Sequence, residues 1–505
     1  MKKRRYLPWF LAVTLLVAGG CGKEDPVAVE EPEIVIEEVL EEEESIEEMI
    51  PMAVHTQKKE KTYYLEAENI PYFYLEYCDV SVEGSQFEKL KRMVENWSVE
   101  RNENLRSVPE TVRENAIAEI REEKEFYGYT LYQDVAIARS DEHLLSLVDS
   151  TYQYSGGGHQ IFVRDGVNFD AQSGKRLELR DIVTDFENFQ TDANEKVISV
   201  LEECYESELY KDYAETVDAM WQDDKEPSWY MDATGIVIVL PESLVGPRSV
   251  GTPEIHLSYQ EFERYIKEDY LPGINDSVAR IAKNEEAFLE LGTSGKQIPM
   301  MLEYQWEDYL SSCTFWLGEE KVSVSDFATL EEAYLIRTNG EVYCLMEMDM
   351  ASDDYVTLMY RLTSGVIQEV DQLNAAIDEG NINPNEIVME TWVYLLGTYG
   401  GIKTYHFAEN HGFITEDQEF ILHNNEFVLT TVQDLTVILD GQEAVLPTGS
   451  HMILNATDNE SYVKFTIPET GQTGMLEVVR GEESYTLTIN GVNEYECFEI
   501  LPYAG

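Results

Sequence analysis

Three consecutive glycines followed by a histidine are the first candidate for chemistry in this sequence. Ser155 precedes Gly156–Gly158, and His159 follows them. A serine nucleophile sits in a Gly-x-Ser-x-Gly turn, whereas here all the glycines follow the serine. His159 could serve as a ligand or a general base, but a histidine that hydrogen-bonds within the glycine turn is the simpler interpretation. No phosphate-binding or dinucleotide-binding glycine pattern occurs, so we predict no catalytic residue and no nucleotide cofactor.

Histidines, acidic clusters and cysteines are the other candidate ligands. His406 and His411 lack the His-Glu-x-x-His spacing that places two ligands on one helix face. The acidic cluster at 349–354 lacks the Asp-x-Asp-x-Asp-Gly calcium loop, so a solvated acidic turn is the simpler interpretation. Beyond position 21 there are five cysteines, an odd number with no Cys-x-x-Cys spacing. The sequence therefore predicts no metal site, no cofactor and no disulfide framework.

The cysteine at position 21 follows a short export signal. Lys2–Arg5 form a positive region, and an apolar run follows from Trp9 to Ala18. That run is too short to cross the roughly 30 Å hydrocarbon core as a helix. The residues Ala-Gly-Gly-Cys that end at Cys21 resemble the lipobox of bacterial lipoproteins, in which the cysteine thiol receives diacylglycerol. The resemblance implies a signal peptide over 1–20, lipidation of Cys21, and a protein held by its N-terminal lipid on the outer face of the cell membrane.

The charge of the chain limits its partners. The sequence has 36 basic and 98 acidic residues, a net charge of −62. Such a surface repels nucleic acid and attracts cationic proteins and peptides, although solubility alone explains the same acidity. Thirteen of the 27 residues at 24–50 are Asp or Glu and none is basic, and like-charge repulsion keeps such a segment extended. We therefore predict an acidic tether over 21–60 and no nucleic-acid partner.

Hydrophobic patterning divides the rest of the chain into three segments. Residues 61–272 alternate strand-like runs with amphipathic helices, which predicts an α+β domain with helices packed on an antiparallel sheet. Residues 273–410 form a mixed segment in which 366–377 is predicted to be a helix. Residues 411–505 contain short strands at regular spacing, which predicts a β-rich module at the C-terminal end. The predicted fold class is therefore α+β, followed by this β-rich module.

Turn dipeptides refine this interpretation. Asn339-Gly340, Asp440-Gly441 and Asn490-Gly491 each lie between apolar runs, where both residues can adopt positive φ and close a tight hairpin. Asp165-Gly166 is a further candidate turn inside the strand predicted at 161–169. These dipeptides predict hairpins rather than reactive groups.

Two motifs within 150–259 resemble a bacterial family: the extracellular domain of lysozyme-sensing anti-sigma factors of the RsiV type and the N-terminal module of PdaC-type peptidoglycan deacetylases. The first motif is an aromatic strand, a Gly-Gly-His turn and an Asp-x-x-x-Gly-Lys hairpin before a helix. The second is a buried strand, Gly235–Leu240, followed by the proline loop at 246–251 and a last strand at 255–259. The matching positions of the first motif are Tyr154, Gly157, Gly158, His159, Asp170, Gly174, Lys175, Leu179 and Asp181.

The resemblance implies a binding protein and not an enzyme. It covers 63–272 and implies a partner-binding surface at Tyr154, Gly157, Gly158, His159, Pro247 and Arg248. Arg248 stands where relatives often have an aromatic residue, and the metal triad of polysaccharide deacetylases is absent. The expected partner is a lysozyme-like protein, a cationic peptide or peptidoglycan. Two alternatives stay open, a cell-envelope hydrolase that uses a carboxylate pair and a structural component of a surface assembly.

Overall fold

A computed structural model describes most of the chain after residue 50. The described residues are 51–65, 70–103, 105, 110–121, 126, 128–156, 160–222, 225–292, 296–307, 310–351, 354–408, 412–423, 427–481 and 486–503. They all fall in one compact unit, Met49–Gly505. Within these ranges no helix has the length and apolar character needed to span a bilayer. The predicted signal peptide, Cys21 and the predicted tether up to residue 50 lie outside the described residues.

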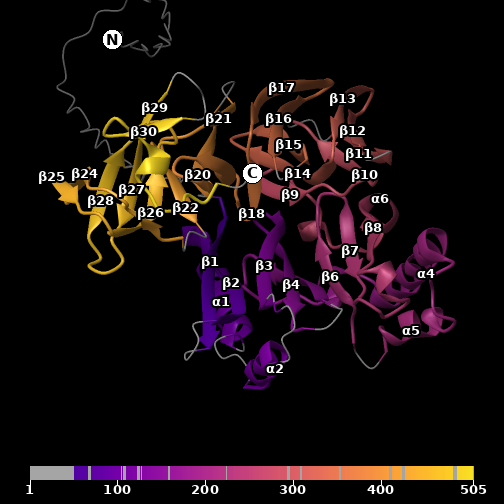
Figure 1. The fold of residues 1–505 in the computed structure, drawn as a ribbon. Coiled ribbons are helices and arrows are strands. Elements are labelled where there is room, and N and C mark those ends of the chain that lie inside the picture. The colour runs from indigo at the N-terminus through magenta and orange to yellow at the C-terminus, as the bar shows by residue number, and fades with distance from the viewer. Residues whose placement is uncertain are drawn as a thin grey trace, which may run out of the picture. The chain divides into compact units, whose positions relative to one another are not determined.

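A ten-stranded sheet runs through the middle of this unit (Figure 1). Its main path is β1-β2-β3-β9-β14-β15-β16-β17, and β4 and β5 extend from β3. The β2–β3 pair is parallel and the other pairs are antiparallel. The strands are β1 (Ala53–Leu65), β2 (Ile70–Glu83), β3 (Tyr129–Ser140), β4 (Leu144–Tyr154), β5 (Ile161–Asp170), β9 (Ser277–Arg280), β14 (Thr329–Thr338), β15 (Glu341–Asp349), β16 (Tyr355–Thr363) and β17 (Val366–Leu373). The sheet thus combines strands from the predicted segments 61–272 and 273–410, and β1 begins before residue 61.

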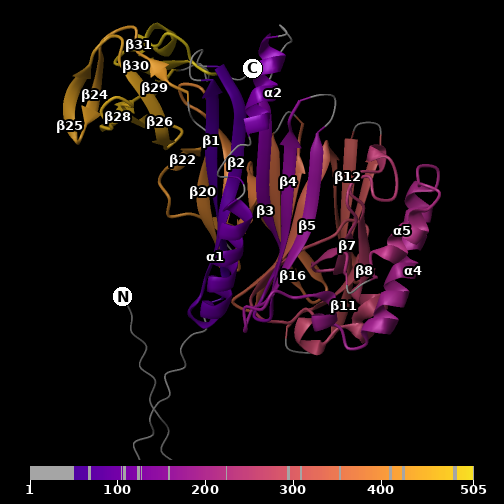
Figure 2. The same cartoon turned by 90° about the horizontal axis from the view of Figure 1, so that it is seen from below.

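Helices cover the N-terminal part of the sheet. After the short helix η1 (Ser85–Phe87), helix α1 (Glu88–Glu103) packs on β2 through Leu90 and Val94, whose spacing of four places them on one helix face (Figure 2). Arg101, near the end of α1, donates to the carboxylate of Asp149 at 2.7 Å. Helix α2 (Glu110–Arg121) packs on a separate aromatic cluster with β2 and β3.

A second helical layer covers a small sheet of three strands, β6 (Ser228–Met231), β7 (Gly235–Val239) and β8 (Glu254–Ser258). Helix α4 (Phe186–Tyr205) lies beside β7 and β8 in both views (Figures 1 and 2). Its buried residues recur every four positions: Phe189, Ala193, Val197 and Leu201. The shorter helices are α3 (Leu179–Ile182), α5 (Tyr213–Ala219), η2 (Arg248–Val250), α6 (Tyr259–Phe262), η3 (Glu263–Tyr265) and η4 (Glu268–Tyr270).

The C-terminal part of the described chain is built from antiparallel strands. A four-stranded sheet contains β10 (Glu286–Glu290), β11 (Gln297–Glu307), β12 (Leu310–Leu317) and β13 (Glu320–Phe327). An eleven-stranded sheet contains β18 (Ala376–Ile382), β19 (Glu386–Tyr394), β20 (Thr398–Ala408), β21 (Gly412–Ile414), β22 (Phe420–His423), β23 (Leu429–Thr430), β24 (Leu435–Leu439), β25 (Gln442–Leu446), β26 (His451–Thr457), β27 (Tyr462–Thr466) and β28 (Thr473–Glu477). A last small sheet has β29 (Val479–Arg480), β30 (Leu487–Ile489) and β31 (Val492–Asn493), and the short helix η5 (Glu494–Glu496) follows it. The predicted fold class, α+β followed by a β-rich module, is confirmed.

All three predicted hairpin turns are confirmed. Asn339-Gly340 joins β14 to β15, Asp440-Gly441 joins β24 to β25, and Asn490-Gly491 joins β30 to β31. Both residues of each pair have positive φ, from 48° to 82°. This is the geometry that a two-residue hairpin of the right twist requires.

Two local predictions were wrong. Residues 366–377, predicted as a helix, form β17 and the start of β18. Their apolar residues recur at three and four positions, but β17 pairs with β16 as the last strand of the main sheet path, so tertiary pairing overrides the local pattern. Asp165-Gly166 is not a turn, because β5 is continuous there. Gly166 instead lies against β6, where an added Cβ would stand 1.7 Å from the carbonyl oxygen of Trp229.

Two asparagine side chains hold the outer edge of β1. The Asn383 amide accepts from the backbone N–H of Val54 at 2.7 Å and donates to its carbonyl at 3.0 Å. Asn381 makes the same pair of contacts with the backbone of Thr56. These side chains satisfy groups that an edge strand otherwise leaves open, and they tie the start of the described chain to β18 and the residues after it.

Candidate functional site

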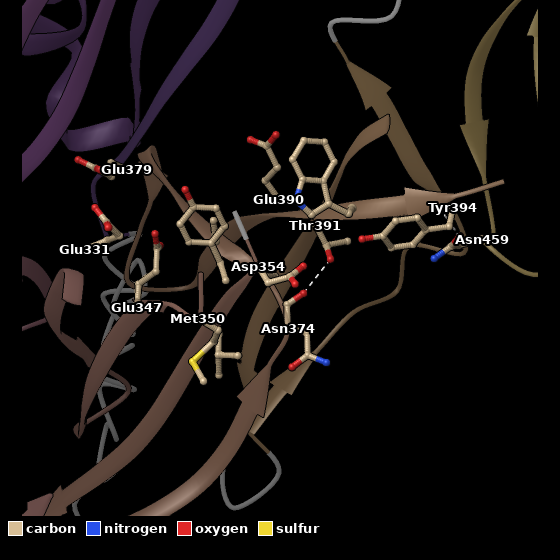
Figure 3. A pocket seen from close by; sticks show the side chains of 15 residues that line it. Glu331, Glu347, Met350, Asp354, Asn374, Glu379, Glu390, Thr391, Tyr394 and Asn459 are labelled. Carbon is tan, nitrogen blue, oxygen red and sulfur yellow. Dashed lines mark hydrogen bonds between the residues drawn. The ribbon is translucent and has the colours of Figure 1, made fainter. Parts of the chain in front are cut away.

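A cavity of about 870 Å³ lies where β14–β16 of the ten-stranded sheet meet β18 and β19 of the eleven-stranded sheet (Figure 3). No Lys, Arg or His is among the residues that line it. Its polar and charged lining residues are Glu331, Glu347, Asp354, Asn374, Glu379, Glu390, Thr391 and Asn459, and its aromatic and apolar ones are Met350, Tyr355, Val356, Ala375, Ala376, Trp392 and Tyr394. We call this space the acidic cavity.

Three glutamates from three strands form one end of the acidic cavity. Glu331 on β14, Glu347 on β15 and Glu379 on β18 lie near one another there (Figure 3). The ladder between β14 and β15 shifts register between Leu330 and Ala333, which leaves one extra residue on β14. A bulge of this kind changes where neighbouring side chains point. Here Glu331 lines the cavity while the adjacent Glu332 forms an ion pair with Arg280.

Burial gives this end of the cavity unusual proton affinities. Glu347 is the one charged residue in the buried interior of β15, and its side chain accepts a hydrogen bond from the backbone N–H of Ile377. Burial, together with the nearby charges of Glu332 and Glu331, raises the pKa of Glu347 to about 8. Burial and the charge of Glu332 also raise the pKa of Glu379 to about 8. Burial raises the pKa of Glu331 as well.

The fourth glutamate behaves in the opposite way. Burial alone would raise the pKa of Glu390, but the hydrogen bond and charge of His423 hold that pKa below its ordinary value. The Nε2 atom of His423 lies 2.8 Å from Oε1 of Glu390. Gly400 leaves room for this pair, since an added Cβ would stand 2.8 Å from His423 and 2.9 Å from Glu390.

A lysine on β1 also senses Glu390. The charges of Asp134, Asp378 and Glu390 raise the pKa of Lys58, although burial of the Lys58 side chain opposes that rise.

One aromatic side chain, Tyr394, stands at the other end of the acidic cavity. Tyr394 and Asn459 lie on the side away from the three glutamates (Figure 3). Trp392 is 38% exposed and Tyr394 is 47% exposed, which is high for large rings in an ordered sheet. The Thr391 hydroxyl donates to the carbonyl of Asn374 at 2.7 Å and ties β19 to the residues before β18.

This arrangement is chemically suited to a cationic group. Carboxylates attract a positive charge, and the faces of Trp and Tyr rings stabilise a cation placed over them. Among the described residues no group of three or more His, Cys, Asp or Glu side chains is arranged to hold a metal ion. The cavity also combines two carboxyls whose pKa is raised to about 8, Glu347 and Glu379, with one whose pKa is lowered, Glu390.

Part of the predicted partner-binding surface can be located. Tyr154 ends β4 and packs edge-on against Tyr129, with ring centroids 6.3 Å apart. Gly157, Gly158 and His159 lie outside the described residues.

The proline loop reaches the same region from the other motif. Pro247 precedes η2, and the exposed Arg248 donates to the carbonyl of Gln160 at 3.1 Å. The fold thus brings the proline loop beside the residue that follows the glycine turn. Neither the proline loop nor Gln160 is among the residues that line the acidic cavity.

The Asp-x-x-x-Gly-Lys motif forms a closed hairpin turn. The backbone N–H of Gly174 donates to the carbonyl of Asp170 at 2.8 Å, and the Asp170 side chain accepts from Ser173. Gly174 has a φ of 72°, and an added Cβ would stand 2.7 Å from the carbonyl oxygen of Lys89. Lys175 pairs with Asp181 at the start of the next helix. In the structure this motif makes packing contacts.

Sequence reasoning missed the residues of the acidic cavity. Glu331, Glu347, Glu379 and Glu390 are spread over four strands, and 98 acidic residues in the chain hide them. One signal was available: Glu347 interrupts the otherwise apolar run of β15, Val342–Met348. A lone carboxylate in such a run must be paired, protonated or functional.

Comparisons with known proteins give structural likenesses at low identity and low TM-score, among them two proteins of one family. No protein-family model matches the chain, and no curated protein matches it. A crystal structure of a DUF3298 family protein from Pseudomonas aeruginosa PAO1 is similar, with 17% identity and a TM-score of 0.32, over 44% of this chain and 98% of that one. A member of the same family from Bacteroides fragilis NCTC 9343 is similar at 17% identity and a TM-score of 0.32, over 43% of this chain and 94% of that one.

Proposed function

We propose that this chain is a lipid-anchored protein of the bacterial cell surface that binds a cationic peptide or protein through the acidic cavity. The observation that carries the proposal is a cavity of about 870 Å³ lined by five carboxylates and three aromatic rings, with no basic side chain among its lining residues. The export signal, the Cys21 motif and the net charge of −62 support the location and the sign of the partner.

Lysine and arginine side chains are the groups that this cavity would take. An ammonium or guanidinium placed at Glu347 and Glu379 would favour their ionised forms, so binding releases protons below about pH 8. The rings of Tyr355, Trp392 and Tyr394 in the lining would hold the aliphatic stem or stack against the cation. A lysozyme-like protein, a short cationic peptide or an amine of peptidoglycan could supply such a group.

Calorimetry with the full-length protein in detergent tests the proposal. The probes are hexalysine and lysozyme, with hexaglutamate as the control of opposite charge. The variant E347Q/E379Q is expected to bind the cationic probes about 10-fold more weakly or worse, because two charge-assisted contacts are lost. The variant E443Q/E477Q removes two carboxyls at exposed positions of β25 and β28 and is expected to bind like the wild type. An equal loss of affinity in both variants would contradict the proposal, because it would mean that the cationic probes respond to the overall negative charge and not to the cavity.

The pH dependence gives an independent check. Affinity for hexalysine is expected to rise from pH 6 to pH 9, as Glu347 and Glu379 lose their protons through their pKa of about 8. The E347Q/E379Q variant is expected to lose most of this rise. A wild-type affinity that stays constant over this range would contradict the role of these two carboxyls.

A hydrolase remains the second candidate, and the protonation states of two glutamates favour it. Glu347 holds its proton at neutral pH and Glu390 is ionised, which is the division of roles that a carboxylate pair needs. Incubation with purified peptidoglycan and mass analysis of the products tests this candidate. Release of fragments that stops in both E347Q and E390Q would establish it in place of binding alone.

A further inference from the structure

A second cavity, of about 420 Å³, lies between β9, β10 and β14. Its volume falls within the range of small-molecule sites, which are largely apolar with a few polar groups. The apolar wall includes Leu271, Phe288, Leu289 and Leu335. Phe288 is 38% exposed, although it is a large ring beside a cavity. None of these residues lines the acidic cavity, so this site is independent of the proposed function.

Arg337 on β14 brings a buried positive charge to this cavity. Its side chain is buried, with 9% of the residue exposed. Its one hydrogen bond to the described residues runs from Nη2 to the carbonyl of Glu290, at 2.8 Å. It forms no ion pair with a carboxylate of the described residues, and burial lowers its pKa although the charge of Glu290 opposes that shift. A buried guanidinium with open donors is matched best by a carboxylate.

The other arginine of this cavity has no such capacity. Arg139 is 2% exposed and donates to the carboxylate of Asp141, to the hydroxyl of Tyr259 and to the carbonyls of Tyr270 and Leu271. Its donors are therefore used within the fold. Arg337 is left as the cation that can receive a ligand.

The lining holds four carboxylates, two of which are used in hydrogen bonds within the fold. Asp141 and Asp232 accept hydrogen bonds from neighbouring groups. The side chains of Glu263 and Glu290 make no hydrogen bond or ion pair with the described residues, and both line the cavity. The cavity therefore presents one cation and two carboxylates, none of them in an ion pair with the described residues, and an apolar wall.

We infer that this cavity binds a small zwitterion with an apolar body, an apolar amino acid or a short apolar peptide. The ligand carboxylate pairs with Arg337, and the ligand ammonium faces Glu290 and Glu263. The apolar side chain packs on Phe288, Leu289 and Leu335. A ligand with a carboxylate alone leaves the two glutamates unmatched, and one with an ammonium alone leaves Arg337 unmatched.

Calorimetry on the full-length protein with four probes tests this inference. Leucine and the dipeptide Leu-Leu carry both charges, N-acetyl-leucine carries the carboxylate alone, and leucinamide carries the ammonium alone. At least one of the first two is expected to bind, and each single-charge probe at least about 10-fold more weakly than the better of them. The stronger of leucine and Leu-Leu identifies the source of the zwitterion. Equal binding of either single-charge probe, or no binding of any probe at millimolar concentration, would overturn the inference.

Variants separate the site from the fold. R337Q is expected to weaken the binding of the better probe about 30-fold or more, because the partner of a buried charge is lost. R361Q, on β16 of the same sheet and outside this lining, is the matched control and is expected to bind normally. F288A keeps Arg337 and is expected to weaken binding several-fold with an unchanged melting profile. Binding of the better probe that is unchanged in both R337Q and F288A would contradict this site. The variant E347Q/E379Q, which changes only the acidic cavity, is expected to bind that probe like the wild type.

Discussion

Replacing Glu347 with glutamine is expected to stabilise the protein at alkaline pH and to leave its stability unchanged in acid. Glu347 is 6% exposed, and its pKa of about 8 compares with an ordinary value of 4.5. Between these two pH values the folded chain holds a proton that the unfolded chain releases. The free energy of unfolding of the wild type therefore falls as pH rises from 4.5 to 8, and then levels off.

The size of the effect follows from the same two pKa values. Each pH unit inside this window removes about 1.4 kcal/mol of stability, so the ionised Glu347 destabilises the fold by about 5 kcal/mol at pH 9. Glutamine has no charge to bury, and its side-chain oxygen can still accept from the N–H of Ile377. The advantage of E347Q over the wild type is expected to be near zero at pH 4.5, about 3 kcal/mol at pH 7 and about 5 kcal/mol at pH 9. Part of it also appears through Glu379, because the loss of a neighbouring charge lowers the pKa of that carboxyl.

Urea denaturation at pH 4.5, 7 and 9, followed by tryptophan fluorescence, measures these differences. E443Q, at an exposed position on β25, is the matched control and is expected to follow the wild type at every pH. A difference between E347Q and wild type that does not change with pH would refute the reasoning, because it would mean that Glu347 ionises normally in the folded chain.

Three further predictions concern the fold and the anchor. G166A is expected to destabilise the protein by about 2–4 kcal/mol in urea denaturation, since the new Cβ collides with the backbone of β6, whereas G273A, with open space at its Cβ, is expected to be nearly neutral. N383A is expected to cost about 2–4 kcal/mol, because it leaves the buried N–H and C=O of Val54 without partners, and amide hydrogen exchange is expected to speed up at Val54 first. C21A is expected to move the protein from the membrane fraction to the soluble fraction and to remove the lipid mass seen by mass spectrometry; firm retention in the membrane would contradict lipidation at this cysteine.

Local chemistry explains which parts of the fold could be predicted. The three Asn-Gly and Asp-Gly turns follow from the φ values that two adjacent residues can adopt, and no distant contact is needed to specify them. Helix α4 likewise follows from a four-residue repeat of apolar side chains. Residues 366–377 carry a similar repeat, yet they form strands because β16 offers a partner that the local sequence does not reveal. Asp165-Gly166 was likewise predicted as a turn, because the local sequence does not reveal that Gly166 packs against the backbone of β6.

The candidate sites depend on contacts that only the folded chain provides. The glutamates of the acidic cavity come from β14, β15, β18 and β19, and each has an ordinary sequence context apart from Glu347. Arg337 follows four apolar residues in β14, Ala333–Ile336, and nothing nearby in the sequence shows that its guanidinium has no ion-pair partner among the described residues. The acidic composition predicts a cationic partner, but it does not show which carboxylates would bind that partner. Those carboxylates are brought together only where two sheets pack against each other.

The asparagine contacts at the edge of β1 have a consequence for the order in which the molecule matures. Val54 and its partner Asn383 are 329 residues apart, so a growing chain completes this edge only tens of seconds after the strand itself has been made, at about 5–20 residues per second. During that interval the strand has open backbone groups and is vulnerable to pairing with other chains. A newly made molecule therefore needs another group to cover the edge of β1 until Asn381 and Asn383 have been made.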